Sequence, residues 1–154
     1  MLFLPAASIS VVGVVTAIVF AAWGTRPLSP WYQSLAKPLW QPEPGTIGLA
    51  WTIIYPLVFF ASLIVLMRGD GTIQFWWIIA FTINMVLNAL WSWLFFVVKN
   101  PKLGSVGLAL LVLSVASLMA LAAMTWWLPM LLLAPYLLWT AVAFAVNYTI
   151  AKMN

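Results

Sequence analysis

The sequence predicts an all-α integral membrane protein: a bundle of five transmembrane helices, with a short helix in the loop that joins the first two. Three observations lead to this fold class. The chain of 154 residues is 66% hydrophobic and only 5% charged, whereas soluble domains carry roughly a quarter charged residues. Apolar stretches of about 20 residues, the length of a bilayer span, separate most of the charges. The sequence has no cysteine and no histidine, which excludes disulfides and imidazole catalysis.

Five apolar segments of a single transmembrane domain are long enough to be spans. They cover residues 4–23, 46–67, 74–98, 104–124 and 129–151. Pro5 suits the first turn of the first helix, and Gly24 follows its last turn. The chain has no charge from Leu103 to Ala151, and this stretch is too long for one span. We place the break before Pro129, after a tryptophan pair that suits the headgroup level of a membrane.

The basic residues predict how the chain is oriented in the membrane. With five spans, one side of the membrane receives Arg26, Lys37, Lys99, Lys102 and Lys152, and the other side receives Arg68. The positive-inside rule then places the first loop, the third loop and the C-terminus in the cytoplasm. These charges are scattered between apolar runs rather than gathered on one face, so nucleic-acid binding is not expected.

The first loop, residues 24–45, is expected to form an ordered lid. Ser29 can cap a short helix that starts at Pro30, and Pro38 ends this helix after about two turns. The stretch 31–40 also carries three aromatic side chains. Such side chains either anchor a loop at the membrane surface or contact a ligand, and composition favours neither interpretation.

Polar and aromatic side chains recur on one face of three spans. They are Trp51, Tyr55 and Ser62 in the second span, Asn84, Asn88, Trp91 and Phe95 in the third, and Tyr136, Trp139 or Thr140, Ala143 and Asn147 in the fifth. Because amides are costly against lipid, the faces that carry the asparagines are expected to turn into the bundle. There they either line a pocket of flat rings and hydrogen-bonding groups or join neighbouring helices directly. Periodicity slightly favours direct packing.

The first loop contains a dense motif that matches a known family. It reads Trp31-Tyr32-x-x-Leu35-x-Lys37-Pro38-x-Trp40-x-Pro42. Further matching residues are Trp51-Thr52 and Tyr55, then Asn88-x-x-Trp91-Ser92 with Phe95-Phe96, and finally Pro135-Tyr136-x-x-Trp139 with Asn147. The pattern covers nearly the whole chain and resembles the TspO/translocator-protein family, also called tryptophan-rich sensory proteins or peripheral benzodiazepine receptors.

The resemblance implies a five-helix bundle, usually a homodimer, whose cavity opens toward the first loop. In that family the cavity binds porphyrins, benzodiazepine-type drugs and, in some members, cholesterol. Carried over by position, the residues that cover the cavity are Trp31, Tyr32 and Pro42. Those that line it are Trp51, Tyr55, Asn88, Trp91, Phe95, Trp139 and Ala143. Two residues depart from the family pattern: Glu43 replaces a frequent second proline, and Asn84 a frequent glutamine.

The leading functional hypothesis is a membrane receptor or regulator that binds protoporphyrin-like tetrapyrroles. The resemblance also suggests two alternatives, a porphyrin or sterol transporter and an enzyme that degrades porphyrin with light and oxygen. In the enzyme, Trp31 and Trp139 would be the redox partners. No acid, base or metal site for conventional catalysis is evident. No metal-bound or covalent cofactor is expected, because haem iron would lack its usual histidine or cysteine ligand.

A permissive sterol pattern lies near the C-terminus. Val146, Tyr148 and Lys152 provide a branched residue, a tyrosine and a basic residue in the proposed order. We favour the simpler interpretation, in which an interfacial tyrosine is followed by a lysine that extends to the headgroups.

Overall fold

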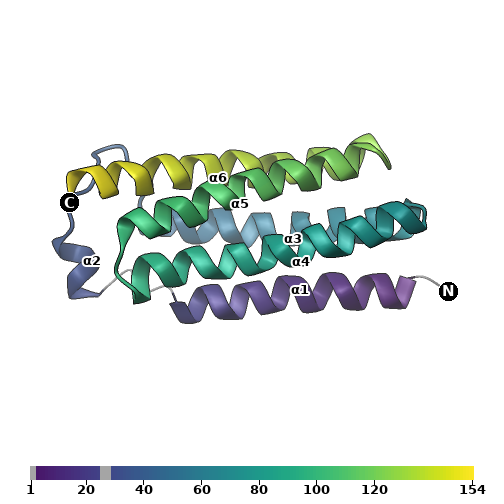
Figure 1. Cartoon of the computed structure of the whole chain (residues 1–154), viewed down its shortest axis with the longest axis horizontal. Coiled ribbons are helices and arrows are strands. Elements are labelled where there is room, and N and C mark those ends of the chain that lie inside the picture. Colours follow the sequence, from purple (N-terminus) through teal and green to yellow (C-terminus); the bar gives the residue numbers. More distant parts are fainter. Residues whose placement is uncertain (1–2, 25–28) are drawn as a thin grey trace.

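The computed structural model describes residues 3–24 and 29–154, and Figure 1 shows the long helices lying along one common direction. The elements are α1 (Phe3–Gly24), α2 (Pro30–Ser34), α3 (Pro44–Arg68), α4 (Gly71–Ser92), η1 (Trp93–Val97), α5 (Pro101–Ala123) and α6 (Trp127–Met153). Arg26 and the part of the expected lid at residues 25–28 lie outside the described residues.

Short polar residues set where several helices begin. The Asp70 carboxylate accepts hydrogen bonds from the Thr72 and Ile73 backbone N–H groups, both at 2.9 Å, and so caps α4. Asn100 caps α5 in the same way, with Pro101 at the first helical position. These caps satisfy backbone donors that have no partner within the helix. Local residue chemistry therefore positions the turns between the spans.

The long helices identify an integral membrane protein. In α3, in α4 together with η1, in α5 and in α6, an apolar stretch with a mean hydropathy between 1.7 and 2.5 is long enough to cross a bilayer. The 22-residue α1 adds the apolar stretch Pro5–Val19. With the short α2 in the first loop, the described residues form the all-α membrane fold that the sequence predicts.

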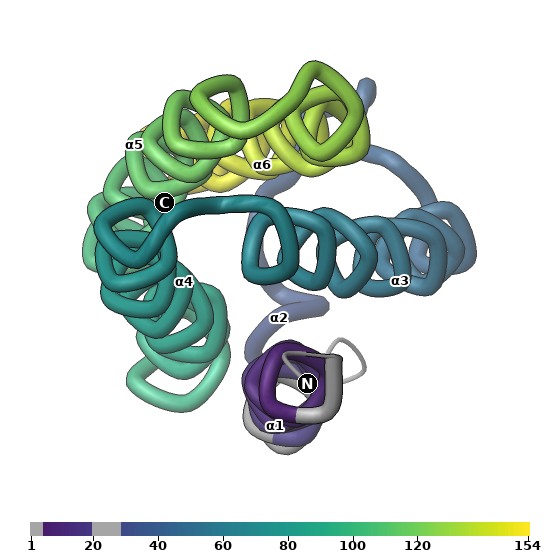
Figure 2. The backbone as a smooth tube through the Cα atoms, turned by 90° about the vertical axis from the view of Figure 1, so that its right-hand side faces the viewer, coloured from purple at the N-terminus to yellow at the C-terminus, as the bar shows by residue number. Residues whose placement is uncertain are grey.

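Figure 2 shows the long helices as a ring in the order α1, α4, α5, α6, α3. Each of them packs against its two neighbours in this ring. The first loop carries α2 across one end of the bundle, toward the C-terminal end of α6 and on to α3 (Figures 1 and 2). The start of α1 and the end of α6 lie at opposite ends of the bundle, as an odd number of long helices requires (Figure 1).

A buried polar junction joins three helices in the half of the bundle away from the lid. The Ser62 hydroxyl accepts hydrogen bonds from Ser10 at 2.8 Å and from the Trp77 indole at 3.1 Å, and all three side chains are fully buried. Gly13 of α1 lies directly beneath the Phe81 ring, which leaves no room there for a larger side chain. Ser62, which shares a stripe with Trp51 and Tyr55 in the sequence, therefore joins α1, α3 and α4.

The C-terminal end of α4 widens into the π-helix η1. The Val98 N–H donates to the Trp93 carbonyl five residues earlier, at 3.0 Å. A π-turn inserts one residue into the helical repeat, so Phe95 and Phe96 are both buried beneath the lid. The segment ends at Lys99, whose φ of 57° lies in the left-handed region.

Candidate functional site

A cavity of about 410 Å³ lies beneath the lid, between the lid-side halves of α3, α4 with η1, and α6. This volume is within the range of small-molecule sites, roughly 300–1,000 Å³. The lining residues are Ile18, Tyr32, Gln41, Pro42, Pro44, Ile47, Gly48, Trp51, Tyr55, Asn88, Trp91, Phe95, Phe96, Trp139, Val142, Ala143, Val146, Asn147 and Ile150. No residue of α5 is among them.

All the expected ligand residues except Trp31 line this cavity. They are Tyr32, Pro42, Trp51, Tyr55, Asn88, Trp91, Phe95, Trp139 and Ala143. Trp31 instead lies in the lid, with its ring edge-to-face on Phe95 at a centroid distance of 5.5 Å. Of the two indoles named as redox partners, Trp139 thus lines the cavity, whereas Trp31 packs against the Phe95 ring that lines it.

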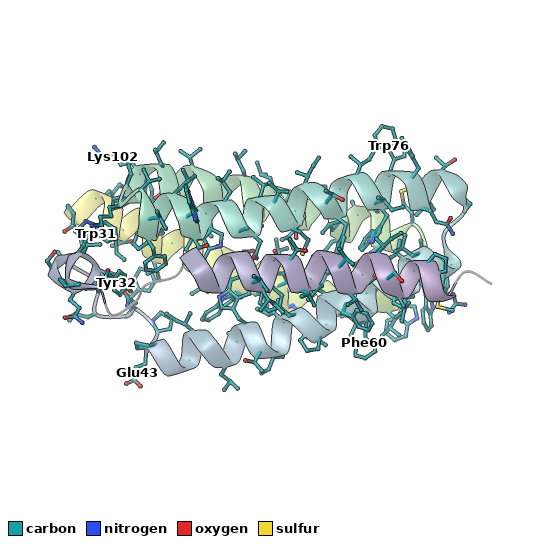
Figure 3. The ribbon with its side chains drawn as sticks, turned by 90° about the horizontal axis from the view of Figure 1, so that it is seen from below. Trp31, Tyr32, Glu43, Phe60, Trp76 and Lys102 are labelled. Atoms are coloured by element: carbon teal, nitrogen blue, oxygen red, sulfur yellow. The ribbon has the colours of Figure 1, made fainter. Side chains whose placement is uncertain are left out.

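Ring contacts hold the lid over the cavity, and one hydrogen bond joins two parts of the lid. Tyr32 packs on Phe95 and Phe96 at centroid distances of 6.0 and 5.4 Å. Its hydroxyl accepts a hydrogen bond from the Gln41 amide at 3.0 Å. Burial raises the pKa of the Tyr32 phenol, and the hydrogen bond to Gln41 partly opposes this shift. The phenol therefore stays neutral at physiological pH. Figure 3 shows Trp31 and Tyr32 at the lid end of the bundle.

A chain of hydrogen bonds crosses the bundle from the cavity. The Tyr55 hydroxyl donates to the Asn88 carbonyl oxygen at 3.1 Å, and the Asn88 amide donates to the Tyr136 hydroxyl at 3.0 Å. Tyr136 donates in turn to Asn84 at 3.0 Å, and the Asn84 amide donates to Ser114 of α5 at 2.7 Å. Tyr55 and Asn88 face the cavity, whereas the other members fix α4 to α5 and α6.

The asparagines confirm the expectation that their faces turn inward, because Asn84 and Asn88 are fully buried and Asn147 is 4% exposed. The two interpretations of these faces both apply, at different residues. Asn84 joins helices directly, and Asn88 does so while also facing the cavity. Asn147 donates to the Pro101 carbonyl and to Ser105 of α5, at 2.8 and 2.7 Å, and its side chain also borders the cavity.

Three buried polar atoms on the cavity-lining residues have no hydrogen-bond partner among the described residues. They are the Gln41 carbonyl oxygen and the indole nitrogens of Trp91 and Trp139. A buried polar group without a partner costs about 1–3 kcal/mol, and such groups are rare in folded proteins. All three atoms belong to side chains that line this one cavity, so a ligand that reaches them needs both hydrogen-bond acceptors and donors.

The sequence did not single out several lining residues, for identifiable reasons. Ile18 belongs to α1, which has no polar stripe, and it reaches the cavity only through the packing of the bundle. Gln41 lies in a loop whose path has no periodicity. Phe96 follows Phe95 directly, and a regular helix would turn the two to different faces. The available signal for Phe96 was the pair Phe95-Phe96 in the family pattern.

The sterol-pattern residues are divided between two environments. Val146 lines the cavity, while Tyr148 is 45% exposed on the outside of α6. The Lys152 amine lies over the Tyr148 ring, 4.5 Å from its centroid. This pair has the geometry of an interfacial tyrosine with a lysine folded over it.

A second, larger hollow of about 750 Å³ lies between α1 and α4. Its rim includes the exposed side chains of Val12 and Val86, and none of the three unpartnered polar atoms borders it. The hollow is therefore an apolar groove between α1 and α4, with buried side chains such as Phe81 and Met85 deeper in it. Its chemistry does not point to a specific ligand, and we assign the candidate site to the cavity beneath the lid.

The cavity offers stacking and neutral hydrogen bonding. No charged side chain is among its lining residues, and the described residues contain no cluster of carboxylates that could hold a metal ion. Trp51 stacks on Tyr55 at 5.3 Å and meets Tyr136 edge-to-face at 6.0 Å, so flat rings form one wall. This arrangement suits a planar apolar molecule with polar edges.

Comparison with known proteins identifies relatives over most of the chain. A family model described as the TspO/MBR family matches residues 7–153. The chain is 34% identical to the uncharacterized membrane protein YtaB of Bacillus subtilis, over 80% of each chain. It is 31% identical to the tryptophan-rich protein TspO of Chlorobaculum tepidum, over 93% of this chain and 92% of the relative. For the TspO protein of Archaeoglobus fulgidus the identity is 32%, over 91% and 92%.

Proposed function

Because this chain belongs to the TspO/MBR family of membrane proteins, we propose that it is a membrane receptor or regulator for protoporphyrin-like tetrapyrroles and related hydrophobic ligands. The ligand occupies the aromatic cavity beneath the lid. The observation that carries this proposal is the set of unpartnered polar atoms, from Gln41, Trp91 and Trp139, around a cavity with flat aromatic walls.

The chemistry of a tetrapyrrole complements these atoms. Its flat macrocycle matches the wall formed by Trp51 and Tyr55, and its carboxylates can accept hydrogen bonds from the two indole N–H groups. A peripheral carboxylic acid group in its protonated form can donate to the Gln41 carbonyl oxygen. Each such bond adds about 0.5–1.5 kcal/mol to binding, and more when one partner is charged. Axial ligation of a metal is not needed for this mode of binding.

A pair of glycines in α3 provides a direct test. Gly48 lines the cavity, and a Cβ atom added there meets nothing within 4 Å. Gly45, one turn earlier, is equally unobstructed but does not line the cavity. We expect Gly48→Leu to fill the cavity mouth and abolish protoporphyrin binding, measured as quenching of tryptophan fluorescence in detergent. Gly45→Leu is the matched control and should bind as the wild type does.

Two results would contradict the proposed site. One is a Gly48→Leu variant that binds protoporphyrin with unchanged affinity, and the other is an equal loss of binding in both leucine variants. The thermal unfolding midpoint of each variant, measured without ligand, separates lost binding from lost folding. Both positions are helical without a positive φ, so leucine is compatible with either backbone.

For orientation, we propose that the lid end of the bundle faces the cytoplasm. Of the described basic residues, Lys37 lies in the lid, and the bounds of the helices place Lys99, Lys102 and Lys152 at the same end and Arg68 at the other. This distribution supports the assignment through the positive-inside rule. The sequence has no cysteine, so a single introduced cysteine is the one thiol that a maleimide can label. In intact cells, an impermeant maleimide should label Thr72→Cys but not Lys102→Cys. The reverse pattern would overturn this orientation.

We also propose a homodimer, because the family resemblance implies one. The mass of the protein in nanodiscs, measured by light scattering after subtraction of lipid, tests this directly. Two chains per particle across a range of lipid-to-protein ratios is the expected result. A single chain at every ratio would contradict it.

A further inference from the structure

We propose that Leu39 and Trp40, at the tip of the lid, insert into the headgroup region of the bilayer that the helices span. They do so beside the last turns of α6. The inference does not depend on which ligand the cavity binds. It concerns the one aromatic side chain of the lid motif that does not pack over the cavity. The motif therefore combines two roles, a cover for the cavity and a contact with the membrane.

The tip is a tight turn that projects its two central side chains outward. The Gln41 N–H donates to the Pro38 carbonyl at 3.0 Å, which closes the turn around Leu39 and Trp40. Leu39 is fully exposed, at 106%, and Trp40 is 55% exposed. Pro38, on one side of them, is buried, and Gln41, on the other, lines the cavity. The apolar pair is therefore the outermost part of an otherwise packed loop.

The loop is fixed on both sides of this turn. The Asn154 side chain accepts a hydrogen bond from the Ala36 N–H and donates one to the Ala36 carbonyl, both at 3.0 Å. On the other side, the Gln41 amide donates to the Tyr32 hydroxyl at 3.0 Å. Because these contacts hold the turn away from the bundle, the tip cannot bury its side chains by collapsing onto the protein. Its apolar surface is therefore available to an external partner.

The position of the turn identifies lipid as this partner. Figures 1 and 2 show the loop passing around the outer side of the C-terminal end of α6 before it reaches α3. The same end of α6 carries Tyr148, exposed on the outside, with the Lys152 amine over its ring. Tyrosine and lysine in this arrangement mark the headgroup level of a membrane. The tip thus belongs to the end of α6 where lipid headgroups begin.

The two side chains suit that level of the bilayer. Tryptophan is enriched at membrane interfaces because its ring is apolar while its N–H remains hydrated, and leucine gains from any transfer out of water. Interfacial segments bury their apolar side about 5–10 Å into the headgroup and acyl boundary. By contrast, Trp31 and Tyr32 of the same lid pack on Phe95. Their rings are already covered by protein.

The absence of cysteine from the sequence allows a depth measurement with single labels. An environment-sensitive fluorophore on Leu39→Cys, in nanodiscs of zwitterionic lipid, should show blue-shifted emission. It should also be quenched by nitroxides attached near the headgroup and protected from aqueous iodide. A label on Ser34→Cys, exposed in the same lid, should behave as a label in water. A label on Leu138→Cys, 69% exposed in the middle of α6, should respond to nitroxides deep in the bilayer.

The native side chain gives a second readout that does not depend on the label. Lipids brominated near the headgroup should quench less of the total tryptophan fluorescence in a Trp40→Phe variant than in the wild type. Iodide quenching at position 39 equal to that at position 34 would overturn the proposal, as would identical bromolipid quenching of Trp40→Phe and wild type. A blue shift that disappears when the protein is diluted in lipid would identify a second copy of the chain as the partner and would also overturn it.

Discussion

Tyr136 is the residue on which the polar interior depends most. Its hydroxyl accepts a hydrogen bond from Asn88 and donates one to Asn84, so one oxygen atom satisfies two amides. The side chain is 1% exposed, and no water can replace it without a rearrangement of α4 and α6. Loss of this oxygen leaves one amide donor and one amide acceptor unpaired in an apolar environment.

We therefore expect Tyr136→Phe to destabilise the protein by about 1 kcal/mol. This figure lies between the cost of an unsatisfied buried group and the smaller average for hydrogen bonds between membrane helices. Unfolding in mixed micelles with increasing denaturing detergent measures it. Tyr148→Phe, which removes a hydroxyl from an exposed ring, is the control. Equal stability of the two variants would show that the hydrogen bonds of Tyr136 with Asn84 and Asn88 make no net contribution to the free energy of unfolding.

The N–H group of Trp139 has a role separate from that of the aromatic ring. The ring lines the cavity, whereas its buried N–H has no partner among the described residues. Trp139→Phe keeps an aromatic ring and removes the donor, so protoporphyrin affinity should fall about two- to tenfold, the equivalent of one net hydrogen bond. Titration by fluorescence quenching measures the change. Trp76→Phe, on an exposed ring at the other end of the bundle (Figure 3), should bind as the wild type does.

The segment that joins η1 to α5 has a conformation that its sequence does not favour. Lys99 adopts a φ of 57°, which costs an L-residue with a side chain roughly 1–2 kcal/mol relative to the right-handed region. Glycine adopts this region freely, although it also gives the unfolded chain more freedom. The position corresponds to the residue after a helix end, where glycine is common in proteins.

Lys99→Gly should accordingly stabilise the protein by about 0.5–1 kcal/mol, the balance of these two effects. The measurement is the unfolding midpoint in detergent. Lys99→Val, which places a branched side chain in the same conformation, should lower the midpoint, and Lys102→Gly inside α5 should lower it as well. A destabilised Lys99→Gly variant would show that the lysine side chain stabilises the folded protein by more than the left-handed backbone conformation costs.

At the scale of helices, residue chemistry predicted much of the arrangement. The break between α5 and α6 was inferred near Pro129 without any charge to mark it, and α6 begins two residues earlier, at Trp127. The spacing of Asn88, Trp91 and Phe95 predicted a shared face, and all three line one cavity. These expectations rest on local rules, in which caps, prolines and periodicity act within a few residues.

Other features depend on interactions that sequence patterns do not contain. The π-turn of η1 brings Phe96 to the same side as Phe95, and a regular 3.6-residue period cannot predict it. Gln41 reaches the cavity because contacts with Asn154 and Tyr32 fix the loop on either side. Those contacts join segments far apart in the chain or across a turn. The same long-range packing covers the rings of Trp31 and Tyr32 and leaves that of Trp40 exposed.

For the molecule as a whole, ligand binding is expected to couple to stability. The cavity is bounded by α3, α4 with η1, α6 and the lid, so a bound molecule contacts elements that must separate when the protein unfolds. A ligand that binds only the folded state adds about 2.7 kcal/mol at a hundred times its dissociation constant. Protoporphyrin should therefore raise the unfolding midpoint in a concentration-dependent manner. The Gly48→Leu variant should show no such rise.

Because the cavity walls are neutral, the salt dependence of affinity distinguishes a ligand bound inside the bundle from one bound at its basic rim. Its lining residues include no ionised side chain, whereas Lys37, Lys99, Lys102 and Lys152 belong to the surrounding end of the molecule. Mobile ions screen exposed charges beyond about 8–10 Å at physiological ionic strength. Affinity for an anionic porphyrin should therefore change little between low and high sodium chloride when the macrocycle lies within the walls. A molecule held only by surface lysines would dissociate as the salt concentration rises.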